Sequence, residues 1–138
     1  MYATLDDLKK QLPEDLLIQL TDDAGNGIID TTVTDNALEA ADVEIDGYLG
    51  ERYALPLSPI PTIINKQAVD VAIYNLYARR QGPPDHWQSR YNNVIRFLEK
   101  VVKGDISLGA EDPDAGEADN AEVSSSDRIF SRDTLKGF

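Results

Sequence analysis

The chain has 138 residues and a formal net charge of −12 at neutral pH; this length predicts one domain and argues against separate catalytic and binding domains. It contains no cysteine, which excludes disulfides, thiolate zinc sites and cysteine nucleophiles. No apolar run reaches the roughly 18 residues that span a bilayer and the N-terminus has no signal-peptide pattern, so we expect a soluble, unexported protein without membrane contact.

The N-terminal part predicts two short helices and a turn. Thr4, followed by acidic residues, is typical of a helix N-cap, and this helix should end near Leu12. Pro13 suits the first position of a second helix, which takes its apolar contacts from residues 16–20. Residues 21–27 are rich in Asp, Asn and Gly and therefore predict a turn.

A long helix should come next, opened by Thr32 and Asp35 as a capping box and ending near Arg52. One stripe of this helix, with spacings of three and four, is expected to face a core or a partner. It comprises Ala37, Ala41, Ile45, Tyr48, Leu49 and Arg52. Three prolines between residues 53 and 61 exclude a continuous helix there and predict an extended connector.

The helix expected over residues 63–81 is apolar around most of its circumference, which predicts that it lies at the centre of the fold. Gly82 and the two prolines after it should end this helix. Asp85 is expected to cap a last helix that ends near Gly104. The inner stripe of that helix is Trp87, Tyr91, Val94, Leu98 and Val101.

The last thirty residues differ in composition from the rest. Residues 110–122 contain six acids and no bases, which predicts a flexible acidic tail over residues 109–138. The end of this tail regains apolar and basic residues and is expected to dock on a partner through Arg128, Ile129, Phe130, Arg132, Leu135 and Phe138. The predicted fold class is all-α, with a connector domain of four to five helices over residues 1–108 before the tail.

Acidic and basic residues are separated along the chain. Residues 1–51 carry 13 acids and 2 bases, whereas residues 52–109 carry 4 acids and 8 bases. An acidic half joined to a basic half favours head-to-tail contacts between copies. The acidic half of one copy is expected to contact four arginines of the next: Arg79, Arg80, Arg90 and Arg96. The same bases, interleaved with aromatic residues, would suit a nucleic-acid surface, but the net charge of −12 disfavours that alternative.

Residues 22–33 partly match a calcium-binding loop of the EF-hand type. Five of its positions are filled by Asp22, Asn26, Gly27, Ile29 and Asp30. Ala24 and Val33 stand where carboxylate ligands are required, and the second of these should be a bidentate Glu. We therefore interpret the segment as a structural turn without a metal.

Candidate catalytic groups are sparse. His86 is the single histidine, so we interpret it as a residue of the first helical turn beside Trp87 and not as part of a triad or metal pair. Asp42 and Asp46, one turn apart, could be imagined as a glycosidase dyad, but among 25 acids such pairs arise by chance. No glycine loop for phosphate is found. We expect no enzyme activity and no cofactor.

Five segments carry a resemblance to a known family: residues 1–8, 17–22, 37–49, 52–57 and 128–138. Together they resemble the Mu-like prophage neck protein family, which is similar in helical layout to the head–tail connectors of other long-tailed phages. Residues 44–57 and the last eleven residues are the specific parts. The family's turn is usually richer in Asp, so Ala24 departs from the pattern.

The resemblance implies a non-enzymatic connector in the virion neck, present in the bacterial host cytoplasm before assembly. Such a connector docks on the portal protein, forms a ring of about a dozen copies and offers a platform to tail-completion proteins. DNA passes through an acidic ring without specific binding, because a negative wall does not hold the duplex. The alternative is a helical adaptor or regulatory protein that binds another protein outside a virion.

Overall fold

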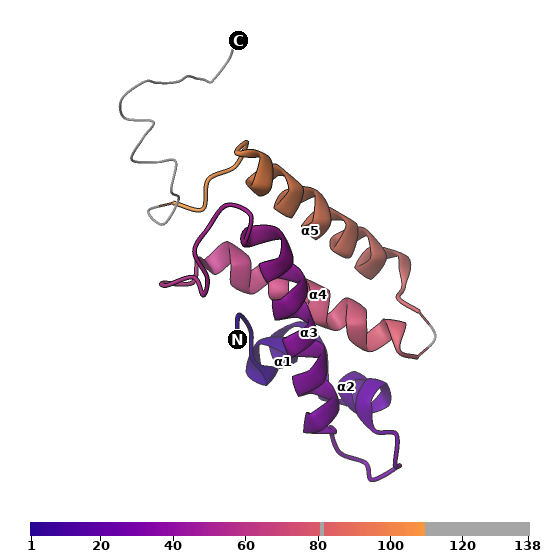
Figure 1. The fold of residues 1–138 in the computed structure, drawn as a ribbon. Coiled ribbons are helices and arrows are strands. Elements are labelled where there is room, and N and C mark those ends of the chain that lie inside the picture. Colours follow the sequence, from indigo (N-terminus) through magenta and orange to yellow (C-terminus); the bar gives the residue numbers. More distant parts are fainter. Residues whose placement is uncertain (81, 110–138) are drawn as a thin grey trace, which may run out of the picture.

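The structure is a computed structural model that describes residues 1–80 and 82–109. Over this range the chain forms helices and no strand (Figure 1), which confirms the predicted all-α class. The helices are α1 (Leu5–Gln11), α2 (Glu14–Thr21), α3 (Thr31–Leu49), α4 (Thr62–Ala78) and α5 (Asp85–Lys103). The predicted docking segment, residues 128–138, lies outside the described residues.

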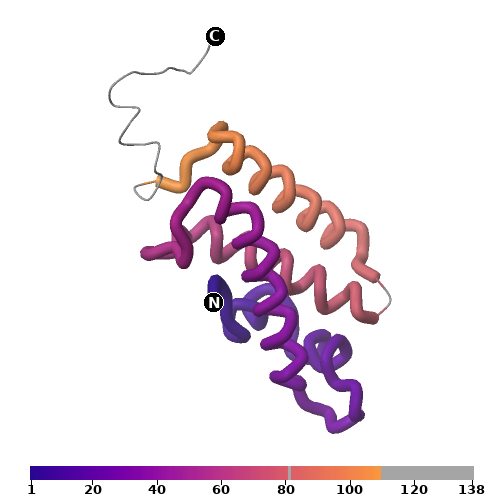
Figure 2. Tube along the Cα trace, viewed as in Figure 1, coloured from indigo at the N-terminus to yellow at the C-terminus, as the bar shows by residue number. Residues whose placement is uncertain are grey.

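The helix α4 lies at the centre of the molecule, as its apolar circumference predicts. It makes its most extensive contacts with α3 and the next most extensive with α5, and α3 also contacts α5. Figure 2 shows these three long helices side by side, with α1 and α2 against α3 and α4. The core holds side chains from all five helices, including Leu8, Leu17, Ile45, Ile73 and Leu98, each fully buried.

The start of α3 differs from the sequence prediction. Asp30 is its N-cap, and the Asp30 carboxylate accepts a hydrogen bond of 3.0 Å from the backbone N–H of Thr32. A capping box opened by Thr32 is therefore wrong, because Thr32 already lies in the first helical turn. The backbone N–H of Asp30 also donates to Oγ1 of the fully buried Thr21, at 3.0 Å. This bond ties the start of α3 to the end of α2.

Two other helix starts are shifted by one residue. Pro13 and Pro84 are the N-caps of α2 and α5, so Asp85 is the first residue of α5 and not its cap. Proline suits such a position because its fixed φ fits the entry to a helix and its missing N–H would have no partner there. The predicted N-cap of α1 at Thr4 is confirmed, and the structure adds a capping box with Asp7, in which both reciprocal hydrogen bonds are present.

The connector after α3 also anchors the far end of α5. Helix α3 ends at Leu49 and not near Arg52, so Arg52 lies in the connector and its side chain turns across the bundle. Its guanidinium donates to the carbonyl oxygens of Val101 and Ile106, at 2.7 and 3.0 Å. The Val101 carbonyl also accepts from the backbone N–H of Gly104, so Arg52 adds a second donor at the end of α5. Gly104 ends α5 with a φ of 89°, as predicted.

Candidate assembly surfaces

Arg79 and Arg80 follow the last residue of α4 and contact the end of α2. Both guanidinium groups bind Asp23, with N–O distances of 2.6 Å each. Arg79 also donates to the carbonyl oxygen of Leu20 at 2.8 Å, and this carbonyl belongs to the last turn of α2, which has few helical donors. The hydrogen bond from Arg79 lowers the pKa of Asp23 below its usual value. The two arginines thus join α4 to the α2–α3 turn.

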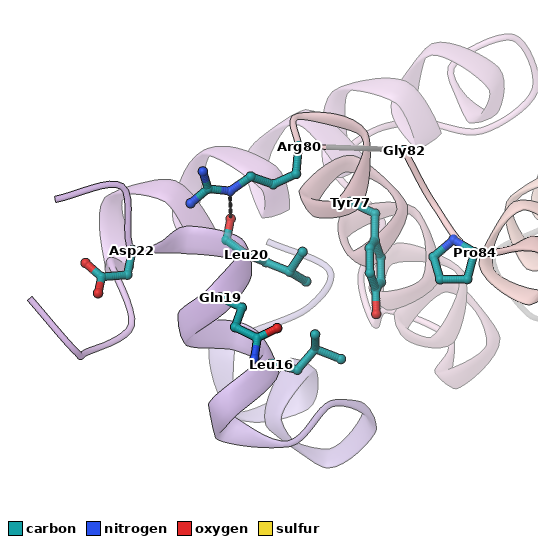
Figure 3. Close-up of a pocket in the computed structure, with 8 residues that line it drawn as sticks. All are labelled: Leu16, Gln19, Leu20, Asp22, Tyr77, Arg80, Gly82 and Pro84. Atoms are coloured by element: carbon teal, nitrogen blue, oxygen red, sulfur yellow. Dashed lines mark hydrogen bonds between the residues drawn. The ribbon is translucent and has the colours of Figure 1, made fainter. Parts of the chain in front are cut away.

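A hollow of about 590 Å³ lies beside this cluster, between α2 and the start of α5 (Figure 3). Its apolar wall is formed by Leu16, Leu20, Tyr77 and Pro84. In Figure 3 the Tyr77 ring stands between the two leucines and Pro84, while the Arg80 side chain reaches over to the Leu20 carbonyl. This wall is suited to an apolar side chain.

The turn of residues 22–30 is held by its first side chain. The Asp22 carboxylate accepts hydrogen bonds from the backbone N–H groups of Asn26 and Gly27, at 2.9 and 2.7 Å, and these bonds lower its pKa. Gly25 and Gly27 have φ values of 75° and 76°, which favour glycine. Both oxygens of Asp22 thus have backbone partners, in keeping with a structural turn. Within residues 1–80 and 82–109, no group of three or more His, Asp or Glu could hold a metal ion.

Arg90 has a partner inside its own chain. It points from α5 towards α4, where Nη2 lies 3.4 Å from Oδ1 of Asp70, and its guanidinium stacks over the Trp87 ring at 4.5 Å. Asp70 is only 2% exposed, and Lys66 supplies a second cation at 3.0 Å. A buried carboxylate needs such pairing. Sequence reasoning missed both pairs of Asp70, and the four-residue spacing of Lys66 and Asp70 on α4 signals only the first of them.

The four arginines predicted to contact a neighbouring copy therefore do not form one patch. Arg79 and Arg80 lie together at Asp23, whereas Arg90 binds Asp70. Arg96 points outward from α5, where it donates to Oδ1 of Asn93 at 2.7 Å. Their contacts with another copy stay a prediction, and so does the docking role of residues 128–138.

Carboxylate–tyrosine contacts join the elements around α3. Tyr91 of α5 donates to Glu44 at 2.5 Å and stacks on Tyr74 of α4, with ring centroids 4.0 Å apart. Burial and the bond to Glu44 raise the pKa of Tyr91. The paired acids Asp42 and Asp46 both bind Tyr2, through its backbone N–H and its hydroxyl. These acids thus anchor the N-terminal segment to α3.

The outward face of α3 carries an apolar side chain that sequence reasoning missed. Val43 is 67% exposed, and it borders an open hollow of about 400 Å³ that is also lined by Asn36, Glu39, Ala40 and Glu44. The signal in the sequence is that Val43 lies two residues after Ala41, away from the inner stripe.

Taken together, the helical fold and these surfaces define a small all-α protein with several candidate contact sites. No helix in the described part of the chain is long and apolar enough to cross a membrane. A sequence profile of the family described as "Bacteriophage Mu, Gp36" matches residues 2–126, and the chain belongs to this family. It is therefore a phage protein.

Two curated relatives match along nearly their whole length. The "Mu-like prophage FluMu protein gp36" of Haemophilus influenzae is 36% identical over 140 residues, which cover 100% of this chain and 98% of the relative. "Gene product J" of Escherichia phage Mu is 33% identical over 141 residues, covering 99% of this chain and 98% of the relative. The resemblance to a Mu-like prophage family is thus confirmed.

Proposed function

We propose that the protein is a head–tail connector of a Mu-like phage, located in the virion neck, where its copies form a ring between the portal and the tail-completion proteins. The role needs no enzyme activity and no cofactor. DNA would pass through the ring without specific binding, because the chain's net charge of −12 repels the duplex. Membership of a phage Mu family over residues 2–126 supports a role in a virion.

The observation that carries the proposal is the opposite charge of two helices on the same bundle. Helix α3 contains five acids and no bases, and α5 contains four bases and two acids. Both helices pack on α4 through their buried stripes, so their outward faces point away from each other. Identical subunits with two complementary faces associate head to tail, and such contacts close into a ring when the rotation allows it.

Deleting the gene from a phage that carries it would test the connector role. We expect DNA-filled heads and separate tails in electron micrographs of the lysate, and joined particles when the wild-type gene is supplied in trans. Mass spectrometry of purified particles should find the protein in the virion. Normal particles after deletion would contradict the proposal and favour an adaptor or regulatory protein outside the virion.

A further inference from the structure

The basic side chains of the molecule fall into two groups. Arg79, Arg80 and Arg90 are bound to Asp23 or Asp70 of their own chain, so using them between copies would break existing pairs. Three exposed bases on the second half of α5 form no ion pair within the described residues: Arg96, Lys100 and Lys103. Their spacings of four and three put them on one side of the helix. We name these three residues the α5 basic face.

The outward side of α3 has the complementary character. Asp35 and Glu39 are exposed and form no ion pair within the part of the chain that the structure describes. One and four residues further on lie Ala40 and Val43, which border the hollow of about 400 Å³. With the intervening polar residue these make up the α3 acidic face: Asp35, Asn36, Glu39, Ala40 and Val43.

We propose that the α5 basic face of one copy binds the α3 acidic face of the next copy. This proposal rests on the self-assembly proposed above and assigns the surfaces that carry it. The two faces match in length, since at 1.5 Å per residue they extend over about 12 Å on α3 and about 10 Å on α5. They also match in chemistry: carboxylates meet cations, and the aliphatic stems of lysine and arginine can cover Val43 in its hollow.

A second copy fits the α3 acidic face better than other occupants do. Nucleic acid is excluded from it by charge, because Asp35 and Glu39 are joined by further acids on the same helix and by no base. Every copy supplies the complementary cations at the same concentration as the acids. Because the two faces of one copy point away from each other, they cannot bind each other within that copy. When two copies bind, one copy keeps an unused basic face and the other an unused acidic face, so further copies can add at both ends.

Charge reversal with compensation tests the pairing. We compare the wild type, Asp35→Lys/Glu39→Lys, Arg96→Glu/Lys100→Glu and the four-fold variant by sedimentation velocity at low ionic strength. Each double reversal should weaken self-association at least about tenfold, because like charges then face each other. The four-fold variant, with the charges exchanged, should regain most of the lost association. High salt should weaken the wild type in the same way.

Matched controls place the same charge changes elsewhere on the surface. Glu14→Lys/Glu51→Lys and Lys9→Glu/Lys10→Glu each reverse two exposed side chains outside both faces, and self-association should stay within about twofold of the wild type. Circular dichroism should show unchanged helix content for all variants, since every substituted side chain is exposed. Equal weakening by the controls would mean that net charge alone decides association, and would overturn the pairing.

The absence of cysteine from the sequence allows a second, geometric test. Val43→Cys and Asn93→Cys place one thiol on α3 and one beside Arg96 on α5. With a short bismaleimide linker, the double variant should form a ladder of linked oligomers, and an equimolar mixture of the single variants should form a linked dimer. Either single variant alone should stay largely monomeric, because a head-to-tail contact does not bring identical residues together.

The outcomes separate the pairing from the connector role. The wild type could self-associate while the charge reversals leave its association unchanged and the cysteine pair forms no linked oligomers. In that case the pairing is wrong, while the protein can still be a connector. If neither association nor linking occurs at any concentration, the pairing is overturned as well. If the protein is missing from purified particles, the connector role fails, whatever the ladder shows.

Discussion

At the scale of single residues, the arginines divide by what their partners contribute to the fold. Arg90 compensates a carboxylate that is largely removed from water, because Asp70 is only 2% exposed. Breaking such a pair leaves a buried charge with less compensation, which costs far more than breaking a pair at the surface. Arg96 lies six residues further along the same helix and has only an exposed amide as its partner.

Replacing Arg90 with alanine should therefore lower the free energy of unfolding by about 1–3 kcal/mol. The reason is the loss of the ion pair with Asp70 and of the stacking over Trp87, with Lys66 left as the remaining cation. Urea denaturation monitored by circular dichroism measures this change in the free energy of unfolding. Arg96→Ala is the matched control and should change the same quantity by less than about 0.5 kcal/mol. Equal effects of the two substitutions would contradict a structural role for the Asp70 pair.

The pKa of Asp42 is shifted in the opposite direction to those of Asp22 and Asp23 in the turn. Its effect on the free energy of unfolding should therefore change with pH in the opposite sense. Burial raises its pKa above the usual 3.8, and Asp46 and Glu39 add to the rise, against the lowering by the Tyr2 backbone N–H. A raised pKa means that the folded protein holds the proton more tightly than the unfolded chain. The charged form present at neutral pH therefore costs stability, and this cost disappears as the pH falls through the raised pKa.

Asp42→Asn should accordingly stabilise the protein at pH 7, because asparagine keeps an acceptor for the Tyr2 N–H without the charge. The gain relative to the wild type should shrink on acidification and vanish where Asp42 of the wild type is protonated in both states. Urea denaturation of both proteins from pH 7 to pH 3 gives the difference. Glu51→Gln, which removes one exposed negative charge just after the same helix, is the control for the change in net charge. A loss of stability at pH 7 would count against the argument.

At the scale of elements, the helix starts and ends decide how the three long helices meet. Asp30 caps α3 and also bonds, through its backbone N–H, to Thr21 at the end of α2. Arg52 likewise joins two elements: from the connector after α3, its guanidinium donates to the carbonyl oxygen of Val101 at the end of α5. The two residues are 49 positions apart in sequence. Such ends have unpaired backbone groups, so one side chain can fix both a helix boundary and a tertiary contact.

Asp30→Ala should cost about 1 kcal/mol of unfolding free energy, the usual loss for an N-cap that accepts from the first turn. Thr32→Ala is its matched control: Thr32 is exposed and contributes only its backbone N–H to the cap, so this variant should change stability by less than about 0.5 kcal/mol. Thermal or urea unfolding separates the two. A larger loss for Thr32 would restore the capping box predicted from the sequence.

The sequence predicts much of the element layout and little of the long-range polar contacts. Helical periodicity places α4 at the centre, and Gly104 ends α5 as predicted, because apolar spacing and a positive φ are local properties. The cap at Asp30 was missed because two competing caps, two residues apart, satisfy the same local rule. The Arg90–Asp70 pair was missed because its partners lie on different helices, and no spacing within one helix reveals which residue a side chain meets across a bundle.

At the scale of the whole molecule, the core and the predicted docking segment are separate in sequence. Every buried hydrophobic residue among the described ones lies between Tyr2 and Val101. Seven further residues, 102–108, follow before the predicted acidic tail of residues 109–138 begins. Stability and partner binding should therefore respond to different parts of the chain, which a truncation can separate.

Deleting residues 126–138 should leave the melting temperature within about 2 °C of the wild type, since a change of 1 kcal/mol would already move a domain of this size by several degrees. Incorporation into phage particles should be lost, because the apolar anchors Phe130 and Phe138 and their neighbouring cations are removed. In the full-length chain, Phe130→Ala/Phe138→Ala should reproduce that loss, whereas Ser124→Ala/Ser125→Ala should not. Melting curves and immunoblots of purified particles measure both properties. A truncated protein that melts early would make the segment part of the folded domain, and normal incorporation would make it dispensable for assembly.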